Sequence, residues 1–333
     1  NLNVCMDARY VIPKKVKEFL PDIVISFGGN IFAGIKEQFR KFAGEFEHWL
    51  VQEDGRVVDL YKSITTIFEC KPEYFFRYCV KMADKDQLND REYYHGLKSY
   101  VDSVVYPDFP YSHVYAIKEV VEKIPSDSVL HLSINDSIRI TNFFKLNPRI
   151  KTYANIGTHG IDGCLSSFLG QAAAGDKQSY LVIGDLAFFY DMNAMRLRHI
   201  KNNVHILLIN NEGGSEFYFN HMWKDEASDL HTTARHHTKA EGWVKSNNFI
   251  YLSAHDKESM QEALKEFMRC DLEKPVFLEV FTEMKTDSDV IYDFFDLSRP
   301  KDVQSETIRR SKEFIKATIG QEKAQKIAGL FKK

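Results

Sequence analysis

The sequence of 333 residues lacks both an excess of charge of one sign and any long hydrophobic run. Its 44 Lys and Arg residues against 47 Asp and Glu residues give a formal net charge of −3. No general positive field therefore favours nucleic acid or an anionic membrane, and a phosphate-bearing ligand would depend on local groups. No apolar run approaches the roughly 18 residues of a membrane span. We expect neither nucleic acid nor a membrane as a partner.

Cysteine is scarce and unpatterned. The five cysteines are odd in number and form no Cys-x-x-Cys pair, which argues against a disulfide framework or a cysteine zinc site: Cys5, Cys70, Cys79, Cys164 and Cys270. A reducing cytoplasm fits this usage. The opening stretch also lacks the basic flank and apolar centre of a signal peptide. Because the first residue is Asn1 rather than Met, we expect the start of a fragment.

Two familiar binding motifs are missing as well. The run Ile23–Ile25 leads through Ser26-Phe27 into Gly28-Gly29 and a helix-like pattern, but this is not Gly-x-Gly-x-x-Gly and predicts no nicotinamide site. His231, His236 and His237 match no zinc spacing and are interpreted as turn or loop histidines.

Short apolar runs alternate with amphipathic segments in the second half of the chain. The runs are 129–132, 180–183, 204–209 and 276–280, with a helix expected at about 191–201. Alternating strands and helices predict parallel strands joined by crossovers, hence an α/β fold. In the first half we expect a strand at 64–68, and a turn at Asp54-Gly55 followed by an extended segment at 56–58.

The chain divides near position 100. Charged residues are dense from 81 to 92, and Pro107 and Pro110 interrupt any helix that follows. We predict a first domain at 1–95, a linker at 96–115 and a second domain at 116–333, whose tail from 305 onward is basic and helix-rich.

The most informative pattern is Gly184-Asp185 after one apolar run and Asn210-Asn211 after the next. A strand–helix–strand crossover of this length brings the carboxyl ends of two parallel strands together, where open α/β sheets bind ligands. With a backbone carbonyl of the Gly213-Gly214 turn, the Asp185 carboxylate and the Asn211 amide oxygen could supply three hard oxygens to magnesium. Taken singly, each dipeptide is also compatible with a plain turn.

This pattern resembles the thiamin diphosphate signature of the decarboxylase and transketolase superfamily. Two further blocks, Asn155–Ser167 and Gly184–Ala194, resemble the 2-succinyl-5-enolpyruvyl-6-hydroxy-3-cyclohexene-1-carboxylate synthases of menaquinone biosynthesis, often called MenD. The turns Asn210–Gly214 and Ser26–Gly29 resemble that family too, so the resemblance covers nearly the whole chain.

The resemblance implies a fold and an activity. It implies a parallel-sheet, three-layer thiamin diphosphate-binding domain at 116–333 and part of a Rossmann-like central domain at 1–95. It further implies thiamin diphosphate and Mg²⁺ as cofactors, decarboxylation of a 2-oxoacid (2-oxoglutarate) with C–C bond formation to isochorismate, and a homodimer or tetramer.

The resemblance also implies roles for individual residues. Asp185, Asn211 and the Gly213 carbonyl would bind magnesium, Ile161 would lie under the thiazolium ring, and Arg139 and His159 would contact substrate. The cofactor-binding set comprises Gly157, Gly160, Ile161, Gly184, Asp185, Leu186, Asn211, Gly213 and Gly214. From the residues alone, Ile161 could equally belong to a core helix, Arg139 could be a structural surface arginine, and His159 could be purely structural.

The chain departs from the family in two ways. The family's activating glutamate lies on an N-terminal pyrimidine-binding domain, which we expect to be absent here, so the isolated chain would hold half a site and be inactive. Ile156 stands where the family has an arginine. This leaves three alternatives: a related 2-oxoacid decarboxylase or acyloin synthase, a non-catalytic scaffold, and one subunit of a split enzyme.

Overall fold

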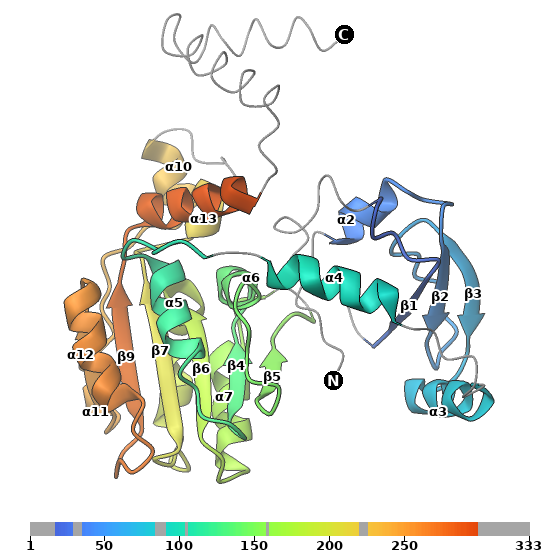
Figure 1. Cartoon of the computed structure of the whole chain (residues 1–333). Helices are drawn as coiled ribbons and strands as arrows, with labels where there is room; N and C mark the ends of the chain where they lie inside the picture. Colours follow the sequence, from blue (N-terminus) through green and yellow to red (C-terminus); the bar gives the residue numbers. More distant parts are fainter. Residues whose placement is uncertain are drawn as a thin grey trace, which may run out of the picture.

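The computed structural model describes residues 17–28, 35–83, 91–103, 106–157, 160–219 and 226–298. Two parallel sheets organise these residues, with strand orders β1-β2-β3 and β5-β4-β6-β7-β9-β8 (Figure 1). Every strand pair in both sheets is parallel, which confirms the α/β class expected from the alternating pattern. Within the described ranges, no helix combines the length and the apolar character needed to cross a membrane.

The larger sheet carries most of the hydrophobic core. Its strands are β4 Val129–Leu132, β5 Lys151–Ala154, β6 Ser179–Gly184, β7 Val204–Asn210, β8 Ile250–Ala254 and β9 Val276–Phe281. The four apolar runs expected as strands correspond to β4, β6, β7 and β9, so these predictions are confirmed. β7 is buried along its whole length, as is typical of a parallel strand covered on both faces.

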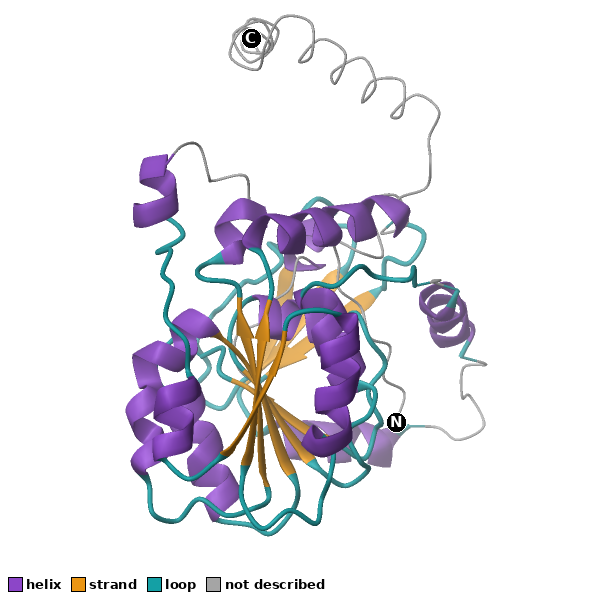
Figure 2. Ribbon diagram, turned by 90° about the vertical axis from the view of Figure 1, so that its left-hand side faces the viewer, coloured by secondary structure: helices purple, strands orange, loops and turns teal. Residues whose placement is uncertain are grey.

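Helices cover both faces of this sheet (Figure 2). They are α5 His113–Val121, α6 Asp136–Thr141, α7 Cys164–Ala173, α8 Asp185–Asp191, α9 Ser215–Phe219, α10 Glu226–His231, α11 Glu241–Ser246, α12 Lys257–Phe267 and α13 Met284–Ser298, with a 3₁₀ turn η2 at Met192–Arg196. Alternate strand residues enter two separate cores. Val182 and Leu207 pack with α5, α12 and α13, whereas Ile183 and Leu208 pack with α7, α8 and α11. The three-layer arrangement follows from this alternation.

The smaller sheet consists of β1 Ile23–Phe27, β2 Glu47–Val51 and β3 Ile64–Phe68, with α2 Ile35–Arg40 between the first two strands. The chain then passes through α3 Pro72–Met82 and α4 Glu92–Asp102 before it enters α5. The strand expected at 64–68 is confirmed as β3. The range 96–115, expected as a linker, contains the second half of α4 and the first residues of α5.

Two local expectations are wrong. The turn at Asp54-Gly55 is present, with Gly55 at φ +62°, but residues 56–58 form no strand because β2 and β3 are parallel and their connection does not fold back as a hairpin. The helix expected at about 191–201 instead begins at Asp185, and η2 then ends at Arg196. The basic tail from 305 onward lies outside the described residues.

Candidate functional site

The carboxyl ends of β6 and β7 bring Asp185 and Asn211 together. Gly184 and Ile209 are register partners in this parallel pair, so the residues that follow the two strands emerge side by side. Asp185 is 2% exposed, and its Oδ2 accepts the backbone N–H groups of Asn211 at 3.1 Å and Gly213 at 3.0 Å. The expected convergence of these three residues at one sheet edge is therefore present.

The glycine turn after Asn211 is held against the segment 233–236. Gly214 N donates to the Thr233 carbonyl at 2.7 Å, and His236 N donates to the Glu212 carbonyl at 3.0 Å. Gly213 has φ +152°, and a Cβ there would lie 2.7 Å from the Thr233 oxygen. Only glycine fits this close backbone approach. The turn is thus a narrow and well-supported cradle beside Asp185.

Each asparagine of the Asn210-Asn211 pair is held by a different buried acid. Asn210 Nδ2 donates to Glu279 Oε1 at 2.7 Å, and Asn211 Nδ2 donates to Asp287 Oδ2 at 3.0 Å. Both carboxylates are 0% exposed. Since the amide nitrogen faces the acid, the amide oxygen of Asn211 faces away from Asp287 and can act as a ligand.

These donors suit a hard cation. A carboxylate, a carboxamide oxygen and the carbonyls of a glycine turn match the oxygen ligands of Mg²⁺, which usually takes few ligands from protein and the rest from phosphate and water. Among the described residues, no group of three His, Cys, Asp or Glu side chains could hold a metal. A cation here would therefore rely on Asp185 together with amide and backbone oxygens.

Two of the three histidines first considered as loop residues contact this edge of the sheet. His236 Nε2 lies 3.4 Å from Asp185 Oδ2, and the nearby Asp185 carboxylate raises the pKa of His236 above its usual range. His237 Nδ1 lies 3.1 Å from Glu212 Oε2 and is exposed. His231 is an exposed residue at the end of α10.

The block that precedes α7 lies on the α7–α8 side of the larger sheet. Ile161 is half-buried and packs against the core formed with α7 and α8. Gly163, at φ +73°, begins α7, and the backbone N–H and hydroxyl of Ser166 both donate to Asp191 Oδ2, at 2.7 and 2.8 Å. These bonds tie α7 to the end of α8. His159 lies outside the described residues.

Two glycines of the cofactor set, Gly157 and Gly184, have open space around them, whereas a Cβ at Gly214 would lie 2.8 Å from the ring of Phe217. A Cβ at Gly157 or Gly184 would meet no atom within 4 Å. Gly184 is the residue before α8, and Leu186 N donates to Asp185 Oδ1 at 2.6 Å within the first turn of that helix. Gly160 is half-buried next to Ile161. Open backbone of this kind permits close approach of a bound molecule.

Arg139 is buried rather than on the surface, so its interpretation as a surface arginine is wrong. Its Nη1 and Nη2 each donate to one oxygen of Glu216 at 2.9 Å, and Nη1 also donates to Asp136 Oδ1 at 2.6 Å. The guanidinium thus makes the bidentate carboxylate contact that such a group is suited to. In this structure the carboxylate is supplied by α9.

His113 continues this polar cluster toward Asn211. Its Nε2 lies 3.7 Å from Asp136 Oδ2 and its Nδ1 lies 3.2 Å from Asp287 Oδ1. Burial lowers the pKa of His113, but attraction by Asp287 and Asp136 outweighs burial and raises the pKa to about 9. A chain of polar contacts therefore connects Asn211, through Asp287, His113 and Asp136, to Arg139.

Two buried carboxylates of this region, Asp287 and Glu279, were missed by sequence reasoning, although each leaves a signal. Asp287 lies on the buried stripe of α13 with Met284, Ile291 and Phe294, and Glu279 interrupts the apolar strand β9. A carboxylate at a core position requires hydrogen-bond donors, so such placement indicates a buried polar network.

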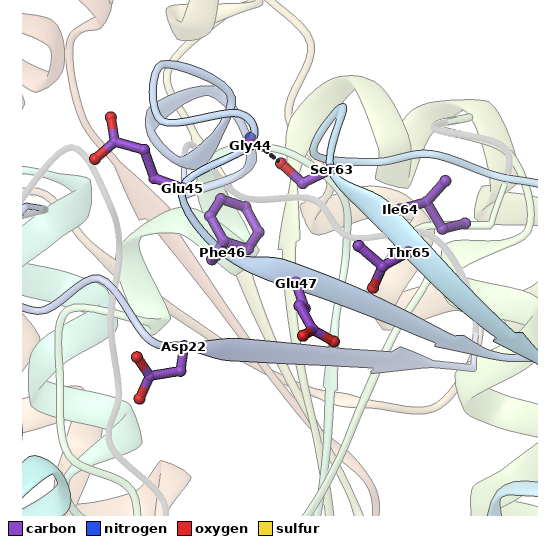
Figure 3. A pocket seen from close by; sticks show the side chains of 8 residues that line it. All are labelled: Asp22, Gly44, Glu45, Phe46, Glu47, Ser63, Ile64 and Thr65. Carbon is purple, nitrogen blue, oxygen red and sulfur yellow. Dashed lines mark hydrogen bonds between the residues drawn. The ribbon is translucent and has the colours of Figure 1, made fainter.

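A hollow of about 450 Å³ lies in the smaller sheet, at the edge where its strands begin (Figure 3). It is lined by Asp22, Gly44, Glu45, Phe46, Glu47, Ser63, Ile64 and Thr65. Its three carboxylates would repel a diphosphate. The edge that carries Asp185 remains the better candidate for a phosphate-bearing cofactor.

Comparison with known proteins confirms the resemblance to the 2-succinyl-5-enolpyruvyl-6-hydroxy-3-cyclohexene-1-carboxylate synthases. The chain is 34% identical over 297 residues to a 2-succinyl-5-enolpyruvyl-6-hydroxy-3-cyclohexene-1-carboxylate synthase of Bacteroides thetaiotaomicron, covering 88% of this chain and 53% of the relative. The chain is also similar to synthases of the same name from two other bacteria. It is 34% identical over 286 residues to that of Bacteroides fragilis, covering 85% of this chain and 51% of the relative. It is 32% identical over 282 residues to that of Flavobacterium psychrophilum, covering 83% of this chain and 50% of the relative. The chain thus spans about half the length of these curated relatives. No protein-family model matches it.

Proposed function

Because the chain is a relative of the 2-succinyl-5-enolpyruvyl-6-hydroxy-3-cyclohexene-1-carboxylate synthases over about half their length, we propose that it supplies the diphosphate- and magnesium-binding half of such an enzyme's site. The observation that carries this proposal is the meeting of Asp185, Asn211 and Gly213 at the carboxyl ends of β6 and β7. This is the edge at which parallel α/β sheets bind ligands.

In this proposal each residue of the edge has a defined task. Asp185, the Asn211 amide oxygen and the Gly213 carbonyl hold Mg²⁺, which neutralises the diphosphate in a chain that has no general positive field. Ile161 supports the cofactor ring from the side of α7. Gly157, Gly160, Gly184, Leu186 and Gly214 allow close backbone approach. When bound, thiamin diphosphate supplies the nucleophilic carbon for decarboxylating a 2-oxoacid and forming a new C–C bond.

The substrates we propose are 2-oxoglutarate and isochorismate, with Arg139 and His159 on the substrate side. Two observations favour a second candidate, a related 2-oxoacid decarboxylase or acyloin synthase with other substrates. Ile156 offers no charge for a carboxylate and packs partly buried against the core shared with α5 and α12. The guanidinium of Arg139 is paired with Glu216, so a substrate carboxylate would have to displace that side chain.

The complete site requires a pyrimidine-binding domain that carries the activating glutamate. We propose that this domain lies on the neighbouring protomer in a homodimer or tetramer of a longer parent protein in the cytoplasm, or on a separate subunit of a split enzyme. The isolated chain would then bind the cofactor without decarboxylating 2-oxoglutarate. A non-catalytic scaffold that binds the cofactor without turnover would behave in the same way until it is combined with such a domain.

Calorimetry on the 333-residue chain tests the proposal. We expect weak binding of thiamin diphosphate that requires Mg²⁺, and loss of that binding in Asp185→Ala. Thiamin without its diphosphate serves as the matched control ligand and should not depend on the metal. Unchanged metal-dependent binding in Asp185→Ala would contradict the magnesium assignment. Decarboxylation of 2-oxoglutarate by the chain alone at an ordinary enzymatic rate would contradict the half-site assignment.

A further inference from the structure

The Asp287 carboxylate accepts three hydrogen bonds and has the His113 imidazole beside it, although it lies on a helix far from Asn211 in the sequence. Its Oδ1 accepts the backbone N–H of His113 at 2.8 Å and lies 3.2 Å from His113 Nδ1. Its Oδ2 accepts Asn211 Nδ2 at 3.0 Å and the Thr282 hydroxyl at 2.6 Å. The side chain is fully buried, so these contacts fix its position.

The contact with Asn211 determines which way the carboxamide faces. An ionised carboxylate only accepts hydrogen bonds, so Asn211 must present its NH₂ group to Asp287 and its oxygen to the opposite side. Without a fixed acceptor, the amide could turn by 180° and present NH₂ to a cation instead. An amide nitrogen in that orientation cannot act as a ligand for Mg²⁺.

We propose that Asp287 is a positioning residue that keeps the carboxamide oxygen of Asn211 directed at the metal position. This inference rests on the proposed function, because it assumes that Asn211 is a metal ligand. Asp287 itself touches neither metal nor cofactor in this account. It lies on α13, which runs across the carboxyl edge of the larger sheet (Figure 1), and acts through its hydrogen bond with Asn211.

The decisive variant is Asp287→Asn, which keeps the shape and replaces one acceptor by a donor. The backbone N–H of His113 can only donate a hydrogen bond. The introduced amide therefore keeps its oxygen facing His113 and turns its NH₂ group toward Asn211. Asn211 must then rotate its own oxygen toward position 287. The metal position loses a ligand, while the packing of α13 is preserved.

The exchange can be reversed by a second substitution. In the double variant Asp287→Asn/Asn211→Asp, the introduced carboxylate at position 211 accepts the NH₂ group with one oxygen and offers the other oxygen to the metal. Thr282→Val is the matched control, because it removes a hydrogen bond to the same Oδ2 without turning the carboxamide.

The experiment measures Mn²⁺ affinity by the electron paramagnetic resonance of free Mn²⁺, on the full chain with saturating thiamin diphosphate. We expect affinity at least tenfold weaker in Asp287→Asn, within twofold of wild type in Thr282→Val, and largely regained in the double variant. Equal affinity in wild type and Asp287→Asn, with Asn211→Ala weakened, would overturn the positioning role alone. Absence of cofactor-dependent Mn²⁺ binding in wild type would overturn both this role and the proposed function.

The double variant also decides the matter if Asp287→Asn does not fold. It retains a donor–acceptor pair between the two positions and should therefore fold and bind Mn²⁺. A folded double variant, checked by near-UV circular dichroism, that binds no Mn²⁺ would contradict the positioning role. A purely structural Asp287 would show changes in unfolding temperature without this pattern of loss and regain.

Discussion

Arg139 on α6 and Glu216 on α9 form a bidentate pair in which each guanidinium Nη lies 2.9 Å from one carboxylate oxygen. The side chain of Arg139 is 9% exposed and that of Glu216 is 20% exposed. Asp136 shares the same guanidinium, and the hydroxyl of Ser215, next to Glu216, donates to Asp136 Oδ2 at 2.7 Å. The segment that follows the glycine turn is thereby fixed to α6 by charge-assisted contacts.

We predict that Arg139→Met destabilises the fold more than Glu216→Gln. Removing the arginine takes away the guanidinium shared by Asp136 and Glu216 and leaves His113 as the cation beside Asp136, at a cost of about 3 kcal/mol or more. Removing the charge of Glu216 leaves Arg139 paired with Asp136 and should cost on the order of 1 kcal/mol. Urea unfolding of both variants measures the difference, and the reverse order would show that Asp136 alone does not satisfy the guanidinium.

Acid should destabilise the protein through His205. This side chain is fully buried in β7, where its Nδ1 lies 2.8 Å from the Phe267 carbonyl. Burial lowers the pKa of His205 to about 4. Because the unfolded chain binds the proton near pH 6.5, the contribution of neutral His205 is present above that pH and is lost as the pH falls toward 4.

The variant His205→Gln isolates this effect, because glutamine can still donate to the Phe267 carbonyl but does not titrate. Between pH 7.5 and 5, we expect the free energy of unfolding to fall by about 2 kcal/mol more in wild type than in the variant. The measurement is a series of urea titrations across this pH range. Parallel curves for the two proteins would show that His205 does not resist protonation in the fold.

The sequence predicted the parts of the fold that depend on apolar patterning. β6, β7 and β9 are buried on both faces and therefore appear as continuous hydrophobic runs. β5 and β8 lie at the two edges of the larger sheet, and β5 is exposed along its length, so neither leaves such a run. Edge strands are set by pairing with a neighbour, which a one-dimensional pattern does not show.

For the candidate site, too, the sequence predicted the local part and missed the contacts between distant segments. Asp185 and Asn211 were placed together because the crossover between β6 and β7 is local and its geometry is regular. The contacts of Asp287 with Asn211 and His113 span 76 and 174 positions of the chain, and no local rule brings these residues together. The pairing of Arg139 with Glu216, over 77 positions, was missed for the same reason.

Glu279 and Tyr251 should be energetically coupled. The hydroxyl of Tyr251 donates to Glu279 Oε2 at 2.7 Å, and burial together with this acceptor raises the pKa of Tyr251. The same carboxylate accepts Ala240 N and Asn210 Nδ2, so it links β8, β9 and the residue before Asn211. Hydrogen bonds to a buried charge contribute more than neutral ones.

A double-mutant cycle with Tyr251→Phe and Glu279→Gln measures this coupling. We expect Tyr251→Phe to cost more in wild type than in the Glu279→Gln background, with a coupling of about 1–2 kcal/mol in the free energy of unfolding. The hydroxyl can rotate and accept from the introduced amide, which is why its loss then matters less. Additive effects in the cycle would show that the carboxylate does not depend on Tyr251.

Gly213 and Gly170 should respond to alanine in opposite directions. A methyl group on Gly213, at φ +152°, would lie 2.7 Å from the Thr233 carbonyl and 3.3 Å from Met284 Sδ, so the turn beside Asp185 must open. We expect Gly213→Ala to cost at least about 2 kcal/mol in the free energy of unfolding, from backbone strain and steric overlap together.

Gly170 lies inside α7, has no positive φ and has no atom within 4 Å of a built Cβ. There alanine should stabilise the helix by about 0.5–1 kcal/mol. Thermal and urea unfolding of the two variants provide the comparison, and a Gly213→Ala protein as stable as wild type would show that the segment 233–236 can move away from the turn without loss.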